Sequence, residues 1–380
     1  MSESIRIDFM GKRNSNIELL RVLAMFFITA HHFAMWGYFI GNDVHAVHSN
    51  IIWLQVIELF GKSGVALFML ITGYFALNPK PTIQKIWQLT NTVRLYALGI
   101  FTILLIVGQL QFNSDLFWRS VFPTLRGLYW FTTIYTIIYI FSGYMAKFLK
   151  QLTHSQAVGF ISLMVLIFMI LPTFFYGWGN SQLTDLIPVF YFGLYLRLYG
   201  ISKRMMTLLK LLTGVAIVIA IGSLVVADVV GSLRPQSQAI AKATQYFVTG
   251  CSPLTFVIAA YIFSYTINLK PRASRVINWM GSSALAIYLI QDNEAFRGVL
   301  WQNIFHVRAL ADTMSPVLFI GYSALVVTMI VVGGILVDKL LMKVLRYPTQ
   351  YLLTAEMAVT NRGLAWFQRM VQATGYRHDP

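Results

Sequence analysis

Long runs of apolar residues, each about as long as a helix that crosses a lipid bilayer, recur along almost the whole sequence. A membrane's hydrocarbon layer is about 30 Å thick and a helical residue rises about 1.5 Å, so a span needs about 20 mostly apolar residues. Only 11% of the residues are charged, against about 25% in soluble domains. The sequence therefore predicts an all-α fold: a polytopic integral membrane helical bundle that is surrounded by membrane lipids.

We expect about ten membrane-spanning helices. The sixth and ninth helices are short for the bilayer. Either flanking polar turns extend these two helices, or the helices cross only part of the bilayer. The predicted spans are 17–40, 56–77, 93–110, 128–148, 157–175, 186–199, 208–226, 246–267, 279–292 and 317–341.

Lys and Arg residues gather in every second loop, and such residues stay on the cytoplasmic side of a membrane. The opposite loops 41–50 and 176–185 contain no Lys or Arg. This pattern predicts that both chain ends are cytoplasmic (N-in and C-in). We divide the chain into a membrane-embedded domain, 1–347, and a cytoplasmic tail, 348–380. The tail is amphipathic, so it is either a helix on the inner leaflet or a solvated helix.

The net charge of +15 does not indicate a nucleic-acid partner, because Lys and Arg are scattered among the loops and form no basic domain. Cys251 is the only cysteine, which excludes an intramolecular disulfide framework and leaves no cysteine cluster for zinc. We expect no metal site.

The first predicted span carries four ionisable side chains, although a charge in hydrocarbon costs about 2.5 to 3.5 kcal/mol. Glu18 and Arg21 stand three residues apart, where an ion pair at the helix end is the expected arrangement. His32 follows Arg21 by eleven residues, so both project from one helix face, about 16 Å apart along the axis. His31 lies about 100° away. An imidazole at this depth suits a general base, but a hydrogen-bonded structural histidine has the same signature.

Other charged residues near the spans have simpler interpretations. Glu58 and Lys62 are four residues apart, a spacing that favours mutual neutralisation over chemistry. Arg94, with Lys80 and Lys85, forms a basic cluster that either holds phosphate groups or only follows the charge rule for cytoplasmic loops.

Four blocks in this order resemble the acyltransferase family 3 membrane enzymes, particularly bacterial ones that O-acylate cell-surface sugars. The first block runs from Ile17 through Arg21 to His31 and His32, with ten residues between Arg21 and His32. The other three run 64–75, 129–135 and 287–301. Two positions depart from the family pattern. Gln291 stands where relatives commonly have a histidine, and Asn91 with Arg94 stands at the spacing of a paired-arginine motif.

The resemblance implies transfer of an acyl group, usually acetyl from acetyl-CoA, to a hydroxyl of a cell-surface polysaccharide or its lipid-linked precursor, in a bacterial plasma membrane. We expect His32 and Arg21 to be the catalytic residues, with His32 as the general base. The CoA phosphates would lie against Arg21, Arg94 and Lys85. Further substrate contacts are expected from residues of the matching blocks: Tyr74, Trp130, Tyr288, Asp292, Asn293 and Arg297.

A transporter or flippase of lipid-linked sugars is the main alternative, because it too has many spans and scattered buried charges. Such folds commonly show internal repeats and interrupted helix pairs, which the sequence does not show convincingly. A membrane sensor or scaffold would bind no acyl-CoA at all. The sequence leaves the oligomeric state open.

Overall fold

The fold was determined as a computed structural model, which describes residues 14–41, 44, 46–78, 81–175, 181–234, 239–244 and 252–373. Several residues discussed above lie outside these ranges, among them Lys80, Cys251, the start of the predicted span 246–267 and the end of the tail. Within the described residues every regular element is a helix, which confirms the all-α class.

The helices follow one another with short connections. Two of them continue as π-helical turns, Met35–Phe39 after α1 and Leu166–Ile170 after α6, and a third π-helical segment covers Val299–Ile304. The helices are α1 (Ser15–Ala34), α2 (Ser49–Phe75), α3 (Ile83–Ile106), α4 (Ser114–Val121), α5 (Trp130–Gln151), α6 (His154–Val165), α7 (Leu171–Phe174), α8 (Gln182–Tyr199), α9 (Lys203–Leu233), α10 (Ala239–Lys242), α12 (Pro253–Ile267), α13 (Arg275–Gly281), α14 (Ala284–Gln291), α15 (Val307–Thr313) and α16 (Pro316–Ala373).

Six helical segments among the described residues are long and apolar enough to cross a membrane. They are Ser15–Phe39, Ser49–Phe75, Ile83–Ile106, His154–Phe174, Lys203–Leu233 and Pro316–Val344. Each overlaps a predicted span. The helices α5 and α8 overlap two more, and α12 is a shorter apolar helix. The total of about ten spans and the cytoplasmic placement of both ends remain predictions.

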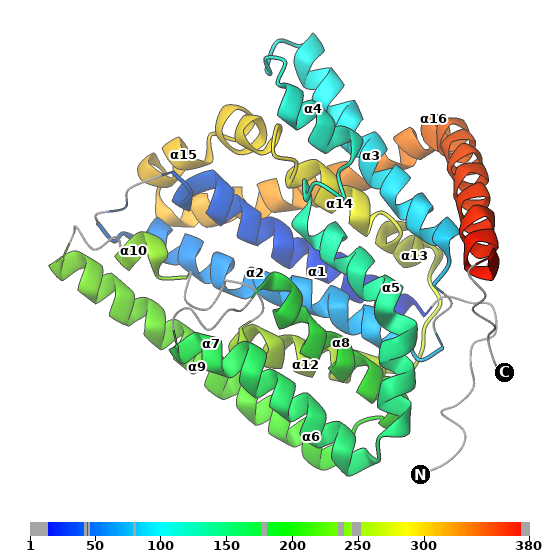
Figure 1. Ribbon diagram of the computed structural model, residues 1–380. Helices are drawn as coiled ribbons and strands as arrows, with labels where there is room; N and C mark the ends of the chain where they lie inside the picture. Colours follow the sequence, from blue (N-terminus) through cyan, green and yellow to red (C-terminus); the bar gives the residue numbers. More distant parts are fainter. Residues whose placement is uncertain are drawn as a thin grey trace.

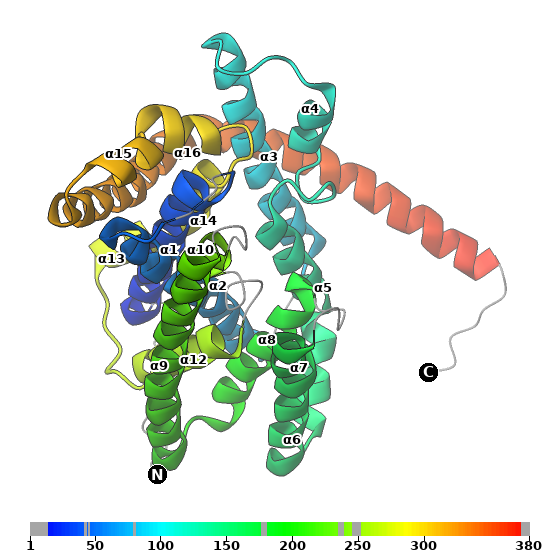
Figure 2. The ribbon, with the colours of Figure 1, turned by 90° about the vertical axis from the view of Figure 1, so that its left-hand side faces the viewer.

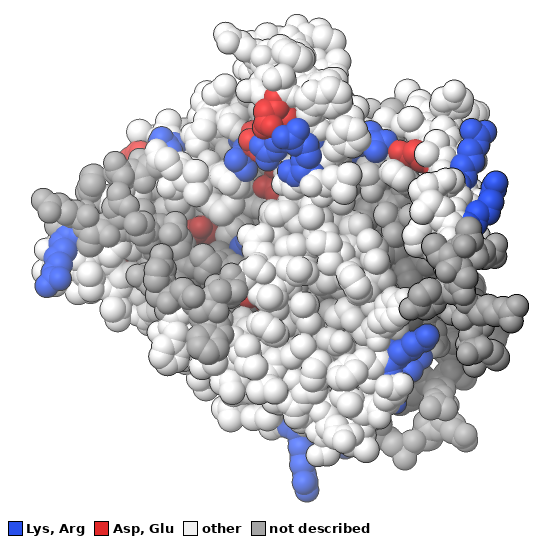
Figure 3. Space-filling model, viewed as in Figure 1, with Lys and Arg blue, Asp and Glu red and all other residues white. Residues whose placement is uncertain are grey.

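The most buried of these segments are α1 and α2, which run side by side through the centre of the bundle (Figure 1). The segment α6–α7 and the helix α9 lie at the periphery. Their outward faces are apolar, with exposed side chains such as Leu211, Val218 and Leu163. Figure 3 shows a broad area without Lys, Arg, Asp or Glu on one face. Such a surface is expected where lipid tails, not water, cover the protein.

The predicted span 279–292 is wrong as a single helix. The structure has two short helices there, α13 and α14, joined at Ser282 and Ser283. Gly281 packs so closely on Glu18 that a Cβ atom would lie 2.5 Å from its carboxylate oxygen. The Ser283 hydroxyl donates to Asp338 of α16 over 2.6 Å. Serine favours helix ends over interiors because its hydroxyl competes for backbone partners, and these contacts fix the break.

The last helix continues without interruption through Pro348, so the tail is helical up to Ala373. Its final part leaves the bundle as an arm (Figure 2). The arm is attached to α3, where Trp87 donates to Thr360 over 3.0 Å and Asn91 donates to Glu356 over 2.6 Å. The division at residue 347 and the location of the tail remain predictions.

Direct backbone contact between α2 and α8 depends on two glycines. A Cβ atom at Gly73 would lie 2.0 Å from the carbonyl oxygen of Phe190, and one at Gly193 would lie 2.3 Å from that of Leu70. Small residues allow this approach, which provides much of the packing energy between membrane helices.

We predict that Gly73→Ala destabilises the protein by about 1 to 3 kcal/mol, because the added methyl group overpacks a backbone contact that cannot give way. Thermal unfolding of detergent-solubilised protein, followed by tryptophan fluorescence, measures the change. Gly99→Ala is the matched control, since no atom lies within 4 Å of a Cβ at that helical position. Equal thermal stability of the two variants would contradict the prediction.

Candidate functional site

The site is built on the contact between α1 and α2. Gly61 of α2 lies against His31, where a Cβ atom would stand 2.0 Å from the histidine Cβ. Gly64, three residues later, lies against the Ala24 carbonyl, where a Cβ atom would stand 2.5 Å from the oxygen. The absence of side chains at these positions lets the two histidines of α1 reach the space beside α2.

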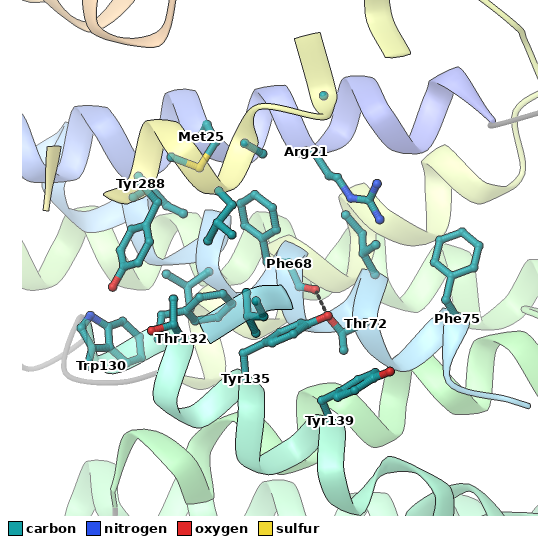
Figure 4. A pocket seen from close by; sticks show the side chains of 18 of the residues that line it. Arg21, Met25, Phe68, Thr72, Phe75, Trp130, Thr132, Tyr135, Tyr139 and Tyr288 are labelled. Carbon is teal, nitrogen blue, oxygen red and sulfur yellow. Dashed lines mark hydrogen bonds between the residues drawn. The ribbon is translucent and has the colours of Figure 1, made fainter. Parts of the chain in front are cut away.

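A cavity of about 680 Å³ opens alongside this contact. It contains five of the residues expected from the sequence: Arg21, His32, Lys85, Trp130 and Tyr288. Figure 4 shows side chains entering it from different helices: Arg21 and Met25 from α1, Phe68 and Thr72 from α2, Tyr135 and Tyr139 from α5, and Tyr288 from α14.

Aromatic rings form one wall of the cavity along α5. Tyr135 and Tyr139 stack with their ring planes 4° apart, and Phe131 packs at 6.3 Å from Tyr135. Phe131 also meets the ring of Tyr288 edge-on, at a centroid distance of 6.1 Å. This wall connects the arginine end of the cavity with the end near Trp130 and suits an elongated, largely apolar ligand.

Arg21 stands at one end of α1, where it forms the ion pair that the sequence predicts. Its Nη1 lies 2.5 Å from Oε1 of Glu18, whose side chain is buried. Arg21 itself remains partly exposed and lines the cavity. Lys85, at the start of α3, lines the cavity too. Two cations therefore face the same space.

His31 has a defined tautomer. Its Nδ1 lies 2.9 Å from the backbone carbonyl oxygen of Glu58. A carbonyl only accepts hydrogen bonds, so Nδ1 must carry the proton and Nε2 keeps its lone pair. That Nε2 atom is buried and has no hydrogen-bond partner among the described residues. The sequence assigned no role to His31, because this residue lies about 100° from the helix face that Arg21 and His32 share.

His32 faces an acidic residue. Its Nε2 lies 3.8 Å from Oδ1 of Asp292, and both side chains are buried. The other ring nitrogen, Nδ1, has no hydrogen-bond partner within the described part of the chain. Asp292 also accepts a hydrogen bond from the Trp36 indole over 3.2 Å. The arrangement allows the carboxylate to stabilise a protonated imidazole.

Asp292, Asn293 and Arg297 lie behind His32 instead of lining the cavity. The Arg297 guanidinium stacks on the ring of Trp36, 3.7 Å from its centroid. Asn293 donates to the Tyr129 hydroxyl over 2.7 Å, and that hydroxyl donates to the Leu289 carbonyl over 3.0 Å.

Two other residues expected at the site lie elsewhere. Arg94 forms an ion pair with Glu356 in the arm of α16, with Nη1 2.8 Å from Oε1, and also donates to the Val121 carbonyl over 2.8 Å. Tyr74 lies beneath Arg197, whose guanidinium is 5.1 Å from the ring centroid.

The structure gives Glu58 and Lys62 different surroundings. The Glu58 carboxylate accepts a hydrogen bond from Thr244 over 2.7 Å. The Lys62 ammonium lies over the Trp130 ring, 4.9 Å from its centroid, and Lys62 lines the cavity. Sequence spacing along one helix did not identify this orientation, because Trp130 comes from a distant segment. Among the described residues, no three His, Cys, Asp or Glu side chains are grouped to hold a metal ion.

We predict that His31 exists as the Nδ1–H tautomer, because its neighbour on that side is an acceptor. Nitrogen NMR of protein labelled with ¹⁵N-histidine distinguishes a protonated from an unprotonated ring nitrogen. The His31→Gln variant assigns the signal by removing it. A signal showing protonated Nε2 and bare Nδ1 would refute the prediction.

Comparison with known proteins identifies one family. A family model for an acyltransferase domain, that of acyltransferase family 3, matches residues 14–336, which extend from the start of α1 well into α16. Searches of curated proteins and of solved structures give no match.

Proposed function

Because the chain belongs to acyltransferase family 3, we propose that this membrane acyltransferase moves an acetyl group from acetyl-CoA to a hydroxyl of a cell-surface polysaccharide or its lipid-linked precursor. The proposed location is a bacterial plasma membrane. One observation carries the proposal: a single cavity contains cations near one end of α1 and two imidazoles near the other. Family membership favours this enzyme over a transporter of lipid-linked sugars.

The donor enters with its charged end at Arg21 and Lys85. Phosphate oxygens form strong charge-assisted hydrogen bonds with guanidinium and ammonium groups. The pantetheine arm then extends along the aromatic wall of α5. Arg21 and His32 are separated by about 16 Å along α1, a gap that an extended arm bridges, so the thioester arrives beside the imidazoles. Arg21 lines the cavity despite its ion pair with Glu18, whereas Arg94 does not line it and is paired with Glu356. We therefore assign the phosphates to Arg21 and Lys85.

His32 takes the proton from the acceptor hydroxyl as its oxygen attacks the thioester carbonyl. A proton on Nε2 facing Asp292 leaves the lone pair on Nδ1, the atom without a hydrogen-bond partner in the described residues. When the imidazole becomes positively charged, Asp292 stabilises it. This gives Asp292 a positioning role, as the group that orients a catalytic base.

The remaining expected residues support the substrates in different ways. Trp130 and Tyr288 line the cavity and contact the acyl end of the donor. Asn293 and Arg297 hold the turn after α14 through Tyr129 and Trp36, which fixes Asp292 beside His32.

We predict that His32→Ala abolishes acetyl transfer, because it removes the general base. The variant should still fold and insert into the membrane, because the substitution only leaves a small cavity. Mass spectrometry of surface glycans from cells with the wild-type protein, the variant or neither measures transfer as one acetyl group per modified sugar. Protein amount in the membrane is the control. Normal acetylation by His32→Ala would remove this residue from the mechanism.

We predict that Arg21→Met raises KM for acetyl-CoA about tenfold or more, because a hydrogen bond to a charged group contributes about 1.5 to 3 kcal/mol. The assay follows CoA release by inside-out membrane vesicles of the producing strain, which expose the cytoplasmic face and contain the endogenous acceptors. Arg94→Met is the comparison variant. If it raised KM more than Arg21→Met, the phosphates would belong at Arg94.

A further inference from the structure

Lys62 brings a positive charge to the end of the cavity where the two histidines lie. It lines the cavity with Gly61, His31 and His32. Its ammonium nitrogen lies over the indole of Trp130, 4.9 Å from the ring centroid. Both histidines interact electrostatically with Lys62, and so does Asp292 behind them.

The position of this lysine is costly in a membrane protein. A Lys side chain at the depth of the bilayer centre costs about 2.5 to 3.5 kcal/mol on insertion scales, so such residues commonly serve ion or substrate binding. The face of an aromatic ring returns about 0.5 to 2 kcal/mol through cation–π attraction. That contact holds the ammonium over the ring of Trp130, which lines the same cavity.

Neutralisation of Glu58 is the simpler explanation, and it does not exclude a second role for Lys62 in the cavity. The Glu58 carboxylate is buried and accepts from Thr244, and the Glu58 backbone carbonyl accepts from His31. Lys62 is electrostatically coupled to Glu58. Its side chain nevertheless lines the cavity, where a substrate would meet it.

We propose that Lys62 is a catalytic residue that stabilises the negative charge formed on the thioester during transfer. The inference rests on the acyl-transfer function proposed above. Electrostatic stabilisation of this kind is commonly the largest single contribution to catalysis of acyl transfer. The other charged side chains among the described lining residues, Arg21 and Lys85, stand on α1 and α3.

The step uses only the two substrates and these side chains. The acceptor oxygen forms a bond to the carbonyl carbon while its proton passes to His32. The carbonyl π electrons move onto oxygen, and the Lys62 ammonium stabilises the resulting oxyanion. When this electron pair returns, the carbon–sulfur bond breaks, and the departing thiolate takes the proton from the His32 imidazolium. The products are the ester and the free thiol of CoA.

Kinetics of two Lys62 variants test the proposal. Inside-out vesicles receive [¹⁴C]acetyl-CoA, and CoA release and labelled product are measured over vesicles without the protein. We expect Lys62→Met to lower kcat about 100-fold or more, the usual loss when an oxyanion donor is removed, with little change in KM. Lys62→Arg keeps the charge and should retain more activity than Lys62→Met. Lys210→Met, an exposed lysine on α9, is the matched control with unchanged kcat.

A double variant separates catalysis from neutralisation of Glu58. If Lys62 only neutralised Glu58, Lys62→Met would leave a buried carboxylate without its counter-charge, and Glu58→Gln/Lys62→Met would restore kcat. A catalytic Lys62 predicts that the double variant is as slow as Lys62→Met. Should Lys62→Met fail to accumulate in the membrane, Lys62→Gln replaces it. Its amide can donate to the oxyanion but carries no charge, so its kcat should fall below that of Lys62→Arg.

Recovery of kcat in the double variant, or a wild-type kcat for Lys62→Met, would overturn the role of Lys62 and leave the acyl-transfer function intact. Wild-type vesicles that release no CoA above the background would overturn the proposed function itself, together with this inference.

Discussion

The close approach of α1 and α2 determines the rest of the site. Helices in a membrane gain little from the hydrophobic effect, since lipid tails are as apolar as leucine, so close packing must hold them together. Gly61 and Gly64 bring the two backbones into contact at His31 and Ala24. The same contact places the Glu58 carbonyl within hydrogen-bond distance of His31. One crossing thus fixes the depth, the tautomer and the orientation of an imidazole.

Several polar side chains elsewhere in the bundle are paired across helices, which suits a protein whose surroundings offer no water. Gln55 of α2 donates to Asp228 of α9 over 2.7 Å. Tyr96 of α3 donates to Asp338 of α16 over 2.8 Å, and Ser283 reaches the same carboxylate. An unpaired polar group in hydrocarbon costs several kcal/mol. These pairs therefore specify which helices are neighbours, whereas the apolar contacts around them would tolerate several arrangements.

The sequence predicted those features that depend on one helix at a time. Apolar length identified the helical class, and the eleven-residue spacing predicted that Arg21 and His32 share one helix face; in the structure both line the same cavity. Contacts between distant segments left no such signal. Arg94 is paired with Glu356, a residue of the tail, so its surroundings were unpredictable from its neighbours. Lys62 was interpreted through Glu58, one turn away, because Trp130, which it contacts, comes from another helix. The break at Ser282 and Ser283 was missed for the same reason: Glu18 and Asp338 fix it from outside.

Three attachment points join α3 to α16, one of them the hydrogen bond from Trp87 to Thr360. Tyr96 is bonded to Asp338, and Arg94 with Asn91 is bonded to Glu356, five helical turns farther along α16. Contacts at several positions along each helix hold α3 and α16 in one relative position. Lys85 lies in the first turn of α3, so its position depends on these contacts between α3 and α16. All three attachment points on α16, Asp338, Glu356 and Thr360, lie beyond residue 336, where the family match ends. Residues beyond the family match therefore help to align a cation that lies within it.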